Sequence, residues 1–240
     1  MKTTFSQLPQ FGSSKFKQAG LPLSGDSAPA KRDFNLDTWD MIFENIESGI
    51  YSEVYSVGDT KTISYDGSEI EIQIAGFDKD ELSDGSGFAP ITLILLHSLG
   101  NAYYINGTYK DVNWGTCTMR RLLRNEYFPK LPQVLRDNIK SVKKTYYKST
   151  AAETSIIDDT IWLLSSRELN YPTAKENSGC IYDDLFKEPS DRIRTDGTNN
   201  VTWWTRTNWS KYYFAHISPY GYIGQTYVNN NQHILFGFCI

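Results

Sequence analysis

The sequence predicts an α+β fold in which one domain, residues 34–240, follows an extended N-terminal arm, residues 1–33. The predicted elements run as a helix, a hairpin, a strand, two helices, a strand and a strand-rich end, and no linker or repeat divides them. Aromatic residues make up 14% of the chain and are weighted towards its 16 tyrosines. Such residues favour strands and recognition surfaces.

Residues 1–33 are rich in Ser, Gly, Pro, Lys and Gln, a composition typical of an extended segment and not of a packed element. Two interpretations stay open. The arm is either a disordered tail or a segment that orders against a partner. In the second case its isolated large apolar residues would be the anchors: Phe5, Leu8, Phe11, Phe16 and Leu21.

The first helix is predicted between Asp37, as its N-cap, and Gly49, at the position after its C-cap. Its apolar residues recur at helical spacing: Trp39, Ile42, Phe43 and Ile46. The segments 60–65 and 68–77 then alternate apolar and polar residues around the pair Asp66-Gly67. Because an Asp-Gly pair suits a type I′ turn, these segments predict a β-hairpin.

A buried strand is predicted at 91–96, followed by two helices and a short strand at 160–165. The first of these helices places Met119, Leu122, Leu123 and Tyr127 on one face. The second starts near Pro132, which a first helical turn tolerates, and points Val134, Leu135 and Ile139 inward. Residues 166–170 form a helical turn, and residues 201–240 form several short strands that are interrupted at 218–221 and 229–231.

Composition argues against several classes of function. The net charge of −4 provides no basic field, so nucleic-acid binding is not expected. The longest apolar run, residues 91–99, is far shorter than the roughly 20 residues that cross a bilayer. The N-terminal residues lack the apolar region of a secretory signal. Cys117, Cys180 and Cys239 form no CxxC pair, which indicates reduced thiols.

The aromatic stretch 201–228 divides between core and surface. Trp203 and Trp204 are adjacent, so they point to opposite faces of a strand, and the favoured interpretation buries both and lets Arg206 build the core with them. The residues after them are candidates for binding a ligand, since aromatic rings stack on sugars and peptides at low entropic cost. These candidates are Trp209, Tyr212, Tyr220 and Tyr222.

Residues 78–84 carry four carboxylates, Asp78, Asp80, Glu81 and Asp84, but not at the spacing of a calcium-binding EF-hand. An ordinary solvated loop is favoured, and no metal or cofactor is predicted. The histidines His97, His216 and His233 are isolated, and no nucleophile elbow or phosphate-binding loop is present. We therefore predict no enzyme activity, although a hydrolase with an unrecognised carboxylate pair stays open.

Five stretches resemble DUF6273, a domain family common in gut bacteria and their phages. They are 112–144 ("VNWGTC…KSVKK"), 77–92 ("FDKDELSDGSGFAPIT"), 158–169 ("DDTIWLLSSREL"), 203–207 ("WWTRT") and 236–240 ("FGFCI"). The resemblance covers residues 39–240. The last two stretches are also similar to the C-type-lectin-like fold of phage variable receptor-binding proteins and formylglycine-generating enzymes. Those enzymes use a pair of cysteines near the end of the fold, whereas Cys239 stands alone here.

The resemblance implies a C-type-lectin-like domain with a twisted, mostly antiparallel sheet, in a phage virion protein of the tail, fibre or capsid surface. The arm would attach it to other virion proteins. The tyrosine-rich surface would bind a host cell-surface glycan or protein, and copies would form a symmetric homo-oligomer such as a trimer. The alternatives are a purely structural decoration or assembly protein without a host ligand, and a bacterial surface adhesion module.

Overall fold

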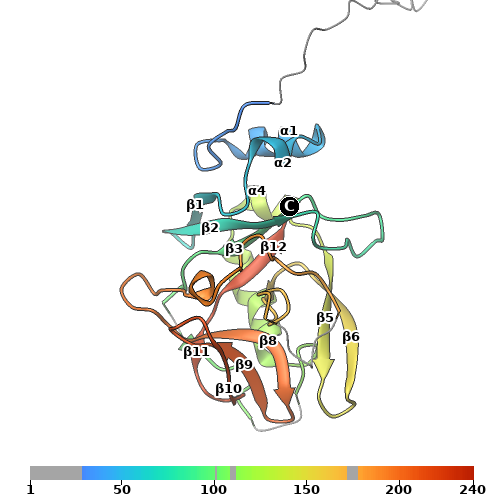
Figure 1. Cartoon of the computed structure of the whole chain (residues 1–240), viewed down its shortest axis with the longest axis vertical. Coiled ribbons are helices and arrows are strands. Elements are labelled where there is room, and N and C mark those ends of the chain that lie inside the picture. Colours follow the sequence, from blue (N-terminus) through green and yellow to red (C-terminus); the bar gives the residue numbers. More distant parts are fainter. Residues whose placement is uncertain (1–28, 101, 109–111, 172–177) are drawn as a thin grey trace, which may run out of the picture.

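The computed structural model describes residues 29–100, 102–108, 112–171 and 178–240. Two short helices, α1 (Trp39–Glu47) and α2 (Tyr51–Val54), lie over a hairpin of β1 (Thr60–Tyr65) and β2 (Ser68–Phe77), as Figure 1 shows. The candidate arm anchors, Phe5 to Leu21, lie outside the described residues.

Two five-stranded sheets form the body of the domain. In the first, the order is β1-β2-β3-β12-β7, with β3 at Ile91–Leu95, β12 at Phe236–Cys239 and β7 at Trp162–Leu163. In the second, the order is β10-β9-β8-β11-β4, with β10 at Ile223–Tyr227, β9 at Tyr213–Ile217, β8 at Trp203–Ser210, β11 at Gln232–His233 and β4 at Ala102–Tyr103. All strand pairings in them are antiparallel except that of β11 with β8.

A separate hairpin of β5 (Val142–Lys148) and β6 (Glu153–Asp159) stands beside these sheets (Figure 1). Between β4 and β5 lie helices of several kinds: α3 (Thr118–Leu122), a π-helical turn (Leu123–Tyr127), a 3₁₀ turn (Phe128–Lys130) and α4 (Gln133–Asn138). A further 3₁₀ turn spans Pro189–Arg192. Few helices and several antiparallel sheets confirm the predicted α+β class.

The C-terminal third is built into both sheets. Strands β8 to β11 belong to the second sheet, whereas β12 inserts between β3 and β7 in the first. Consequently Phe236, Phe238 and Ile240 are buried, in the same apolar core as Ile42 of α1. This topology places the aromatic stretch and the early helices on one scaffold.

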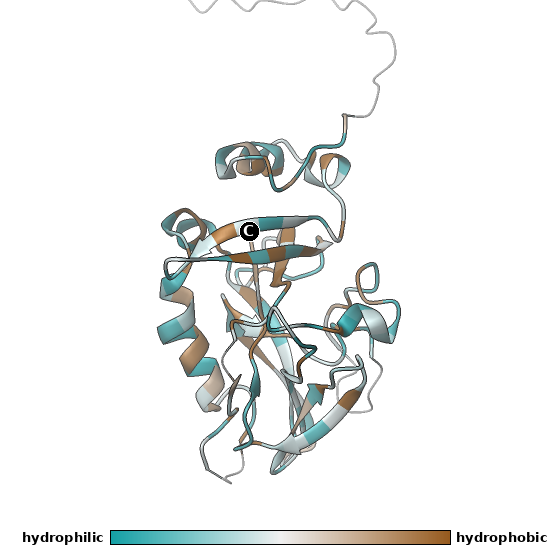
Figure 2. Cartoon of the chain, turned by 90° about the vertical axis from the view of Figure 1, so that its left-hand side faces the viewer, coloured by the Kyte–Doolittle hydropathy of each residue, from teal (hydrophilic) through white to brown (hydrophobic). Residues whose placement is uncertain are grey.

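The predicted hairpin is confirmed. Asp66 and Gly67 both have positive φ, 51° and 79°, as a type I′ turn requires. Buried and exposed residues alternate along β1, and Figure 2 shows the matching alternation of hydrophobic and hydrophilic residues on the strands below the helices. Gly49 also takes the predicted position after α1, with φ of 72°.

Several local predictions are wrong. The N-cap of α1 is Thr38, whose hydroxyl accepts the Met41 N–H, because the Asp37 carboxylate instead pairs with Arg32 and accepts the Tyr55 hydroxyl. The β5–β6 hairpin was not predicted at all. Lysines interrupt the apolar pattern of β5, and the turn places Ala152, not a glycine, at φ of 53°.

No helix among the described residues is both long and apolar enough to traverse a bilayer. Cys117, Cys180 and Cys239 are free thiols in the structure.

Candidate functional site

The exposed tyrosines gather on the turns and strands of β8, β9 and β10. Tyr220 and Tyr222 occupy the β9–β10 turn with 75% and 57% of their surface exposed. Tyr212 precedes β9 at its other end and is 37% exposed, and Trp209 on β8 is half-buried beside an irregularity in the β8–β9 pairing. Of the four candidates, Tyr212, Tyr220 and Tyr222 are therefore exposed, whereas Trp209 is half-buried.

The structure separates these candidates into two groups. Because β9 spans five residues and a strand rises about 3.4 Å per residue, the Tyr212 end lies roughly 17 Å from the Tyr220 end. The group at the Tyr212 end also includes Tyr213 and Tyr227, whose ring centroids lie 4.4 Å apart. The other group consists of Tyr220 and Tyr222. Sequence reasoning missed Tyr227, which is 42% exposed. Its position two residues after Gln225, on the same face of β10, was the available signal.

The β9–β10 turn holds its tyrosines on a defined backbone. The Ser218 hydroxyl accepts the N–H groups of both Tyr220 and Tyr222, and the Ser218 N–H donates to the Tyr222 carbonyl. Gly221 has φ of 79°, and a Cβ at this position would lie 1.7 Å from the Pro189 carbonyl oxygen. Only glycine fits there, so the turn packs closely against the 3₁₀ turn that begins at Pro189.

Trp203, Trp204 and Arg206 belong to the interior, in agreement with the favoured interpretation. The indole N–H of Trp203 donates to the Arg192 carbonyl at 3.1 Å, and that of Trp204 donates to the Tyr103 carbonyl at 2.7 Å. These three residues are at most 1% exposed, so they are not available to a ligand.

Arg206 belongs to a buried charge cluster, which we define as Asp80, Lys144, Glu168 and Arg206. The Lys144 ammonium donates to the Asp80 carboxylate and, at 2.9 Å, to Glu168. Arg206 Nη2 donates to Glu168 at 2.9 Å. All four side chains are at most 2% exposed. Two carboxylates and two cations make the cluster electrically neutral, and burial of such charges requires this pairing.

Neutral groups complete the hydrogen bonding around the cluster. Asp80 accepts the hydroxyl of Thr92 at 2.6 Å and that of Tyr182 at 2.9 Å. The thiol of Cys180 donates to the same carboxylate at 3.1 Å, and that of Cys239 contacts it at 3.6 Å. Burial raises the pKa of both thiols well above the ordinary value, so neither is a ready nucleophile.

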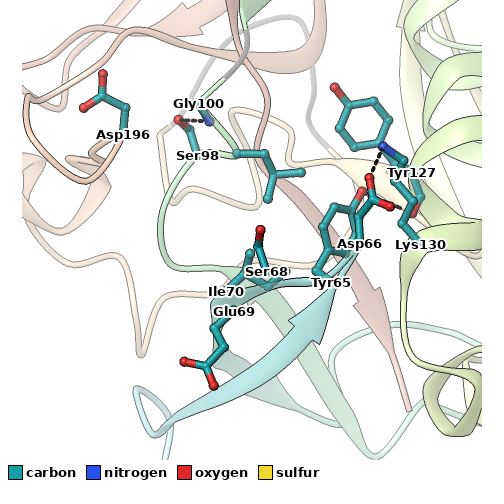
Figure 3. A pocket seen from close by; sticks show the side chains of 11 residues that line it. Tyr65, Asp66, Ser68, Glu69, Ile70, Ser98, Gly100, Tyr127, Lys130 and Asp196 are labelled. Carbon is teal, nitrogen blue, oxygen red and sulfur yellow. Dashed lines mark hydrogen bonds and ion pairs between the residues drawn. The ribbon is translucent and has the colours of Figure 1, made fainter.

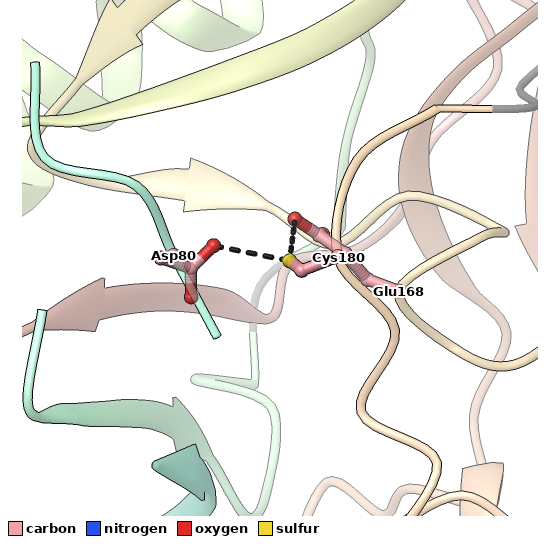
Figure 4. Close-up of side chains that lie close together, drawn as sticks. All are labelled: Asp80, Glu168 and Cys180. Atoms are coloured by element: carbon pink, nitrogen blue, oxygen red, sulfur yellow. Dashed lines mark hydrogen bonds between the residues drawn. The ribbon is translucent and has the colours of Figure 1, made fainter. Parts of the chain in front are cut away.

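Within the cluster, Lys144 competes with a metal ion for the same carboxylates. Ligand atoms of Asp80, Glu168 and Cys180 lie within 4.8 Å of one another, a separation that could hold a metal ion (Figure 4). The Lys144 ammonium, however, bonds both carboxylates and supplies the positive charge that an ion would bring. A metal would have to displace a buried lysine.

The acidic loop departs in part from the expected solvated loop. Asp80 is only 2% exposed and belongs to the charge cluster. The other carboxylates are turned towards separate partners: Asp78 accepts the Tyr51 hydroxyl, Glu81 pairs with Lys143, and Asp84 accepts the Ser86 N–H and hydroxyl. They do not converge on a common point.

A groove between the β1–β2 hairpin and residues 98–100 has a volume of about 410 Å³ (Figure 3). In it Asp66 pairs with Lys130 at 2.7 Å, and the Ser98 hydroxyl lies 2.8 Å from His233 Nδ1. A serine–histidine pair becomes nucleophilic when a third group orients the imidazole. Among the described residues, no carboxylate hydrogen-bonds to His233. Within the described residues, the groove therefore lacks a carboxylate that would orient the imidazole of His233.

Titration of the cluster should make the protein acid-sensitive. Burial opposes ionisation of Asp80, but Lys144 outweighs it and holds the pKa at about 2 against the ordinary 3.8. Arg206 and Lys144 likewise lower the pKa of Glu168 despite its burial. A lowered carboxyl pKa stabilises the fold above the ordinary value, and this contribution is lost as the pH falls towards the folded value.

We therefore expect urea titrations to show unfolding free energy falling between pH 4 and pH 2, with roughly 2 kcal/mol of the loss due to Asp80. An Asp80→Asn variant should be less stable at every pH. The part of the pH-dependent loss of unfolding free energy that is due to Asp80 should be absent from it. Equal slopes for the two proteins would contradict the assignment.

A comparison with protein families matches residues 91–240 to DUF6273, a domain of unknown function. The match covers more than half of the chain, so the protein belongs to the DUF6273 family. The match is shorter than the resemblance expected over residues 39–240: α1, α2, β1, β2 and the stretch 77–92, apart from Ile91 and Thr92, lie outside it. The search of curated proteins and that of solved structures returned no match.

Four stretches within the match and the preceding stretch 77–92 meet at the cluster. Residues 77–92 supply Asp80, residues 112–144 end on Lys144, residues 158–169 contain Glu168, residues 203–207 contain Arg206, and residues 236–240 contain Cys239. Each stretch thus contributes a side chain to one buried network. This links the sequence signature to the stability of the scaffold and not to an exposed site.

Proposed function

We propose that this protein is a phage virion component of the tail, fibre or capsid surface. Its C-type-lectin-like domain uses the tyrosine-bearing turns of β8 to β10 to bind a host-surface glycan or another virion protein. One observation carries the binding role: Tyr220 and Tyr222 are exposed on a turn that Ser218 and Gly221 hold in place. Rigid aromatic side chains bind with little loss of conformational entropy.

The self-contained charge cluster supports a binding role over a catalytic one. Its charges are paired, its thiols have raised pKa values, and its carboxylates are buried. Catalytic groups need free capacity to accept or donate a proton at a substrate. The virion assignment itself comes from the resemblance to phage proteins, and the arm, residues 1–33, is the segment proposed to attach the domain to its particle.

Binding is tested on an array of bacterial cell-surface glycans and on host-cell pull-downs with the purified chain. We expect the double variant Tyr220→Ala/Tyr222→Ala to lose at least about tenfold in affinity, because each truncation of a binding aromatic typically costs more than about 1 kcal/mol. Leu36→Ala is the matched control, since Leu36 is 78% exposed but lies before α1, away from the turn.

Deletion of residues 1–28 should leave binding intact and prevent incorporation into particles. If the double variant binds as well as the wild type, or if no glycan or cell binds either protein, the purely structural alternative is favoured. If the protein that lacks residues 1–28 is incorporated into particles normally, the proposal that the arm attaches the domain is wrong.

A further inference from the structure

The turn that carries Tyr220 and Tyr222 lies beside a polar loop, residues 197–200. The side-chain amide of Asn200 donates to the Pro219 carbonyl at 3.3 Å, so the loop is bonded directly to the turn. The four loop residues, Gly-Thr-Asn-Asn, are all exposed. We call the two tyrosines and this loop the tyrosine surface.

Backbone hydrogen bonds fix the shape of the loop. The Asp196 carboxylate accepts the N–H of Thr198 at 3.0 Å and that of Asn199 at 2.8 Å, and the Asp196 N–H donates to the Asn199 carbonyl. The Thr198 hydroxyl and the Asn199 side-chain amide take no part in these bonds. Hydroxyl and amide groups both donate and accept hydrogen bonds, as sugar hydroxyl groups do. The loop therefore presents polar groups that suit a sugar, beside two aromatic rings that can stack on one.

The exposed aromatic area of this surface is small for a protein interface. A tyrosine buries about 150–250 Å² when it is covered, so Tyr220 and Tyr222 together contribute at most about 500 Å². A stable protein–protein interface buries about 800 Å² on each partner. The tyrosine surface is therefore better suited to a few sugar units than to a protein.

The arginines closest in sequence to this surface point into the protein. Arg192 and Arg194 are only 4% and 6% exposed, and both guanidinium groups donate to backbone carbonyl groups. Carboxylate and phosphate groups of ligands are usually held by arginine or lysine side chains. Neither arginine is available for that role.

The exposed lysines on either side of this surface in the sequence give it no net positive charge. Lys187 adjoins Glu188, which is also exposed, so the two charges offset each other. Lys211 lies at the other end of β9, with its ammonium 5.2 Å from the centre of the Tyr212 ring. Asp196, at the base of the loop, is exposed and adds a negative charge. An anionic ligand would therefore meet more negative than positive charge here.

We propose that the tyrosine surface binds an uncharged glycan. The sugar rings would stack on Tyr220 and Tyr222, and the sugar hydroxyl groups would bond the side chains of Thr198 and Asn199. This inference rests on the proposed function and deepens it, because it narrows the ligand from a host glycan or a virion protein to a neutral sugar chain.

Matched pairs of oligosaccharides test this inference on the purified full-length chain. Each pair consists of a neutral chain of hexose and N-acetylhexosamine units and the same chain capped with sialic acid or phosphate. We expect the neutral member to bind at least about tenfold more tightly, because the charged cap meets carboxylates without a compensating cation. Raising the salt concentration should change the affinity of the neutral member by less than about twofold. Isothermal titration calorimetry measures both quantities.

Two variants locate the binding on this surface. Asn199→Ala should weaken binding of the neutral chain about fivefold, because it removes one hydrogen-bonding side chain and keeps the backbone bond to Asp196. Lys211→Ala is the matched control, since Lys211 is exposed beside Tyr212 at the other end of β9, and its affinity should equal that of the wild type. Near-ultraviolet circular dichroism checks that both variants are folded.

Tighter binding of the charged members, or similar affinities for Asn199→Ala and Lys211→Ala, would overturn this inference but leave the proposed binding function standing. The same conclusion follows if Tyr220 and Tyr222 are needed to bind a virion protein and no glycan binds. Absence of binding to every glycan, host cell and virion protein would instead contradict the proposed function itself.

Discussion

Replacement of Lys144 by methionine is expected to lower the free energy of unfolding by about 3–5 kcal/mol. Methionine matches the length of lysine but carries no charge, so Asp80 and Glu168 would both lose their shared cation in the interior. Domains of this kind are stable by only about 5–15 kcal/mol, so the loss would be a large fraction of the total. Urea denaturation followed by tryptophan fluorescence measures it.

Lys143→Met provides a matched control for this experiment. Lys143 precedes Lys144 on β5 but pairs with Glu81, and these two side chains are 31% and 51% exposed. Exposed ion pairs contribute about 0–1 kcal/mol, so this variant should remain close to the wild type. Similar effects from the two substitutions would show that the cluster does not hold the domain together.

Truncation of Trp204 to alanine should cost about 3–5 kcal/mol, because it removes a large buried side chain and leaves a cavity. The same change removes the hydrogen bond from the indole N–H to the Tyr103 carbonyl, which joins β8 to β4. Thermal unfolding followed by circular dichroism should therefore show a much lower midpoint, with no change in fold at low temperature.

Trp209→Ala separates the two roles of the aromatic stretch. Trp209 is only half-buried, so its loss should destabilise the protein much less than the loss of Trp204. If Trp209 contributes to the binding surface, its loss should weaken ligand binding instead. Comparable destabilisation by both variants would mean that the stretch is core throughout.

Local chemistry predicted much of the fold. The Asp66-Gly67 turn and the spacing around Ile42 depend on neighbouring residues alone, and both are found where expected. The β5–β6 hairpin was missed because lysines interrupt the apolar pattern of β5. One of these lysines, Lys144, is buried only because Asp80 and Glu168 approach it from distant parts of the chain. A local sequence pattern does not reveal such a long-range pairing.

The candidate site was predicted in composition but not in arrangement. Exposure of Tyr212, Tyr220 and Tyr222 follows from their positions at turns, which a sequence can reveal. Their division between the two ends of β9 depends on the register of β9 with β10, in which Tyr213 lies opposite Tyr227. That register is set by the folded sheet. Likewise, burial of Asp80 within an acidic loop depends on a partner 64 residues away.

Differential scanning calorimetry of the chain that lacks residues 1–28 tests most directly whether the C-terminal third and the early helices form one scaffold. Strand β12 lies inside the first sheet, and the charge cluster joins β5 to β8. We therefore predict one transition with equal calorimetric and van't Hoff enthalpies. Two separate transitions, with the tyrosine-bearing strands still folded after the first, would contradict this claim.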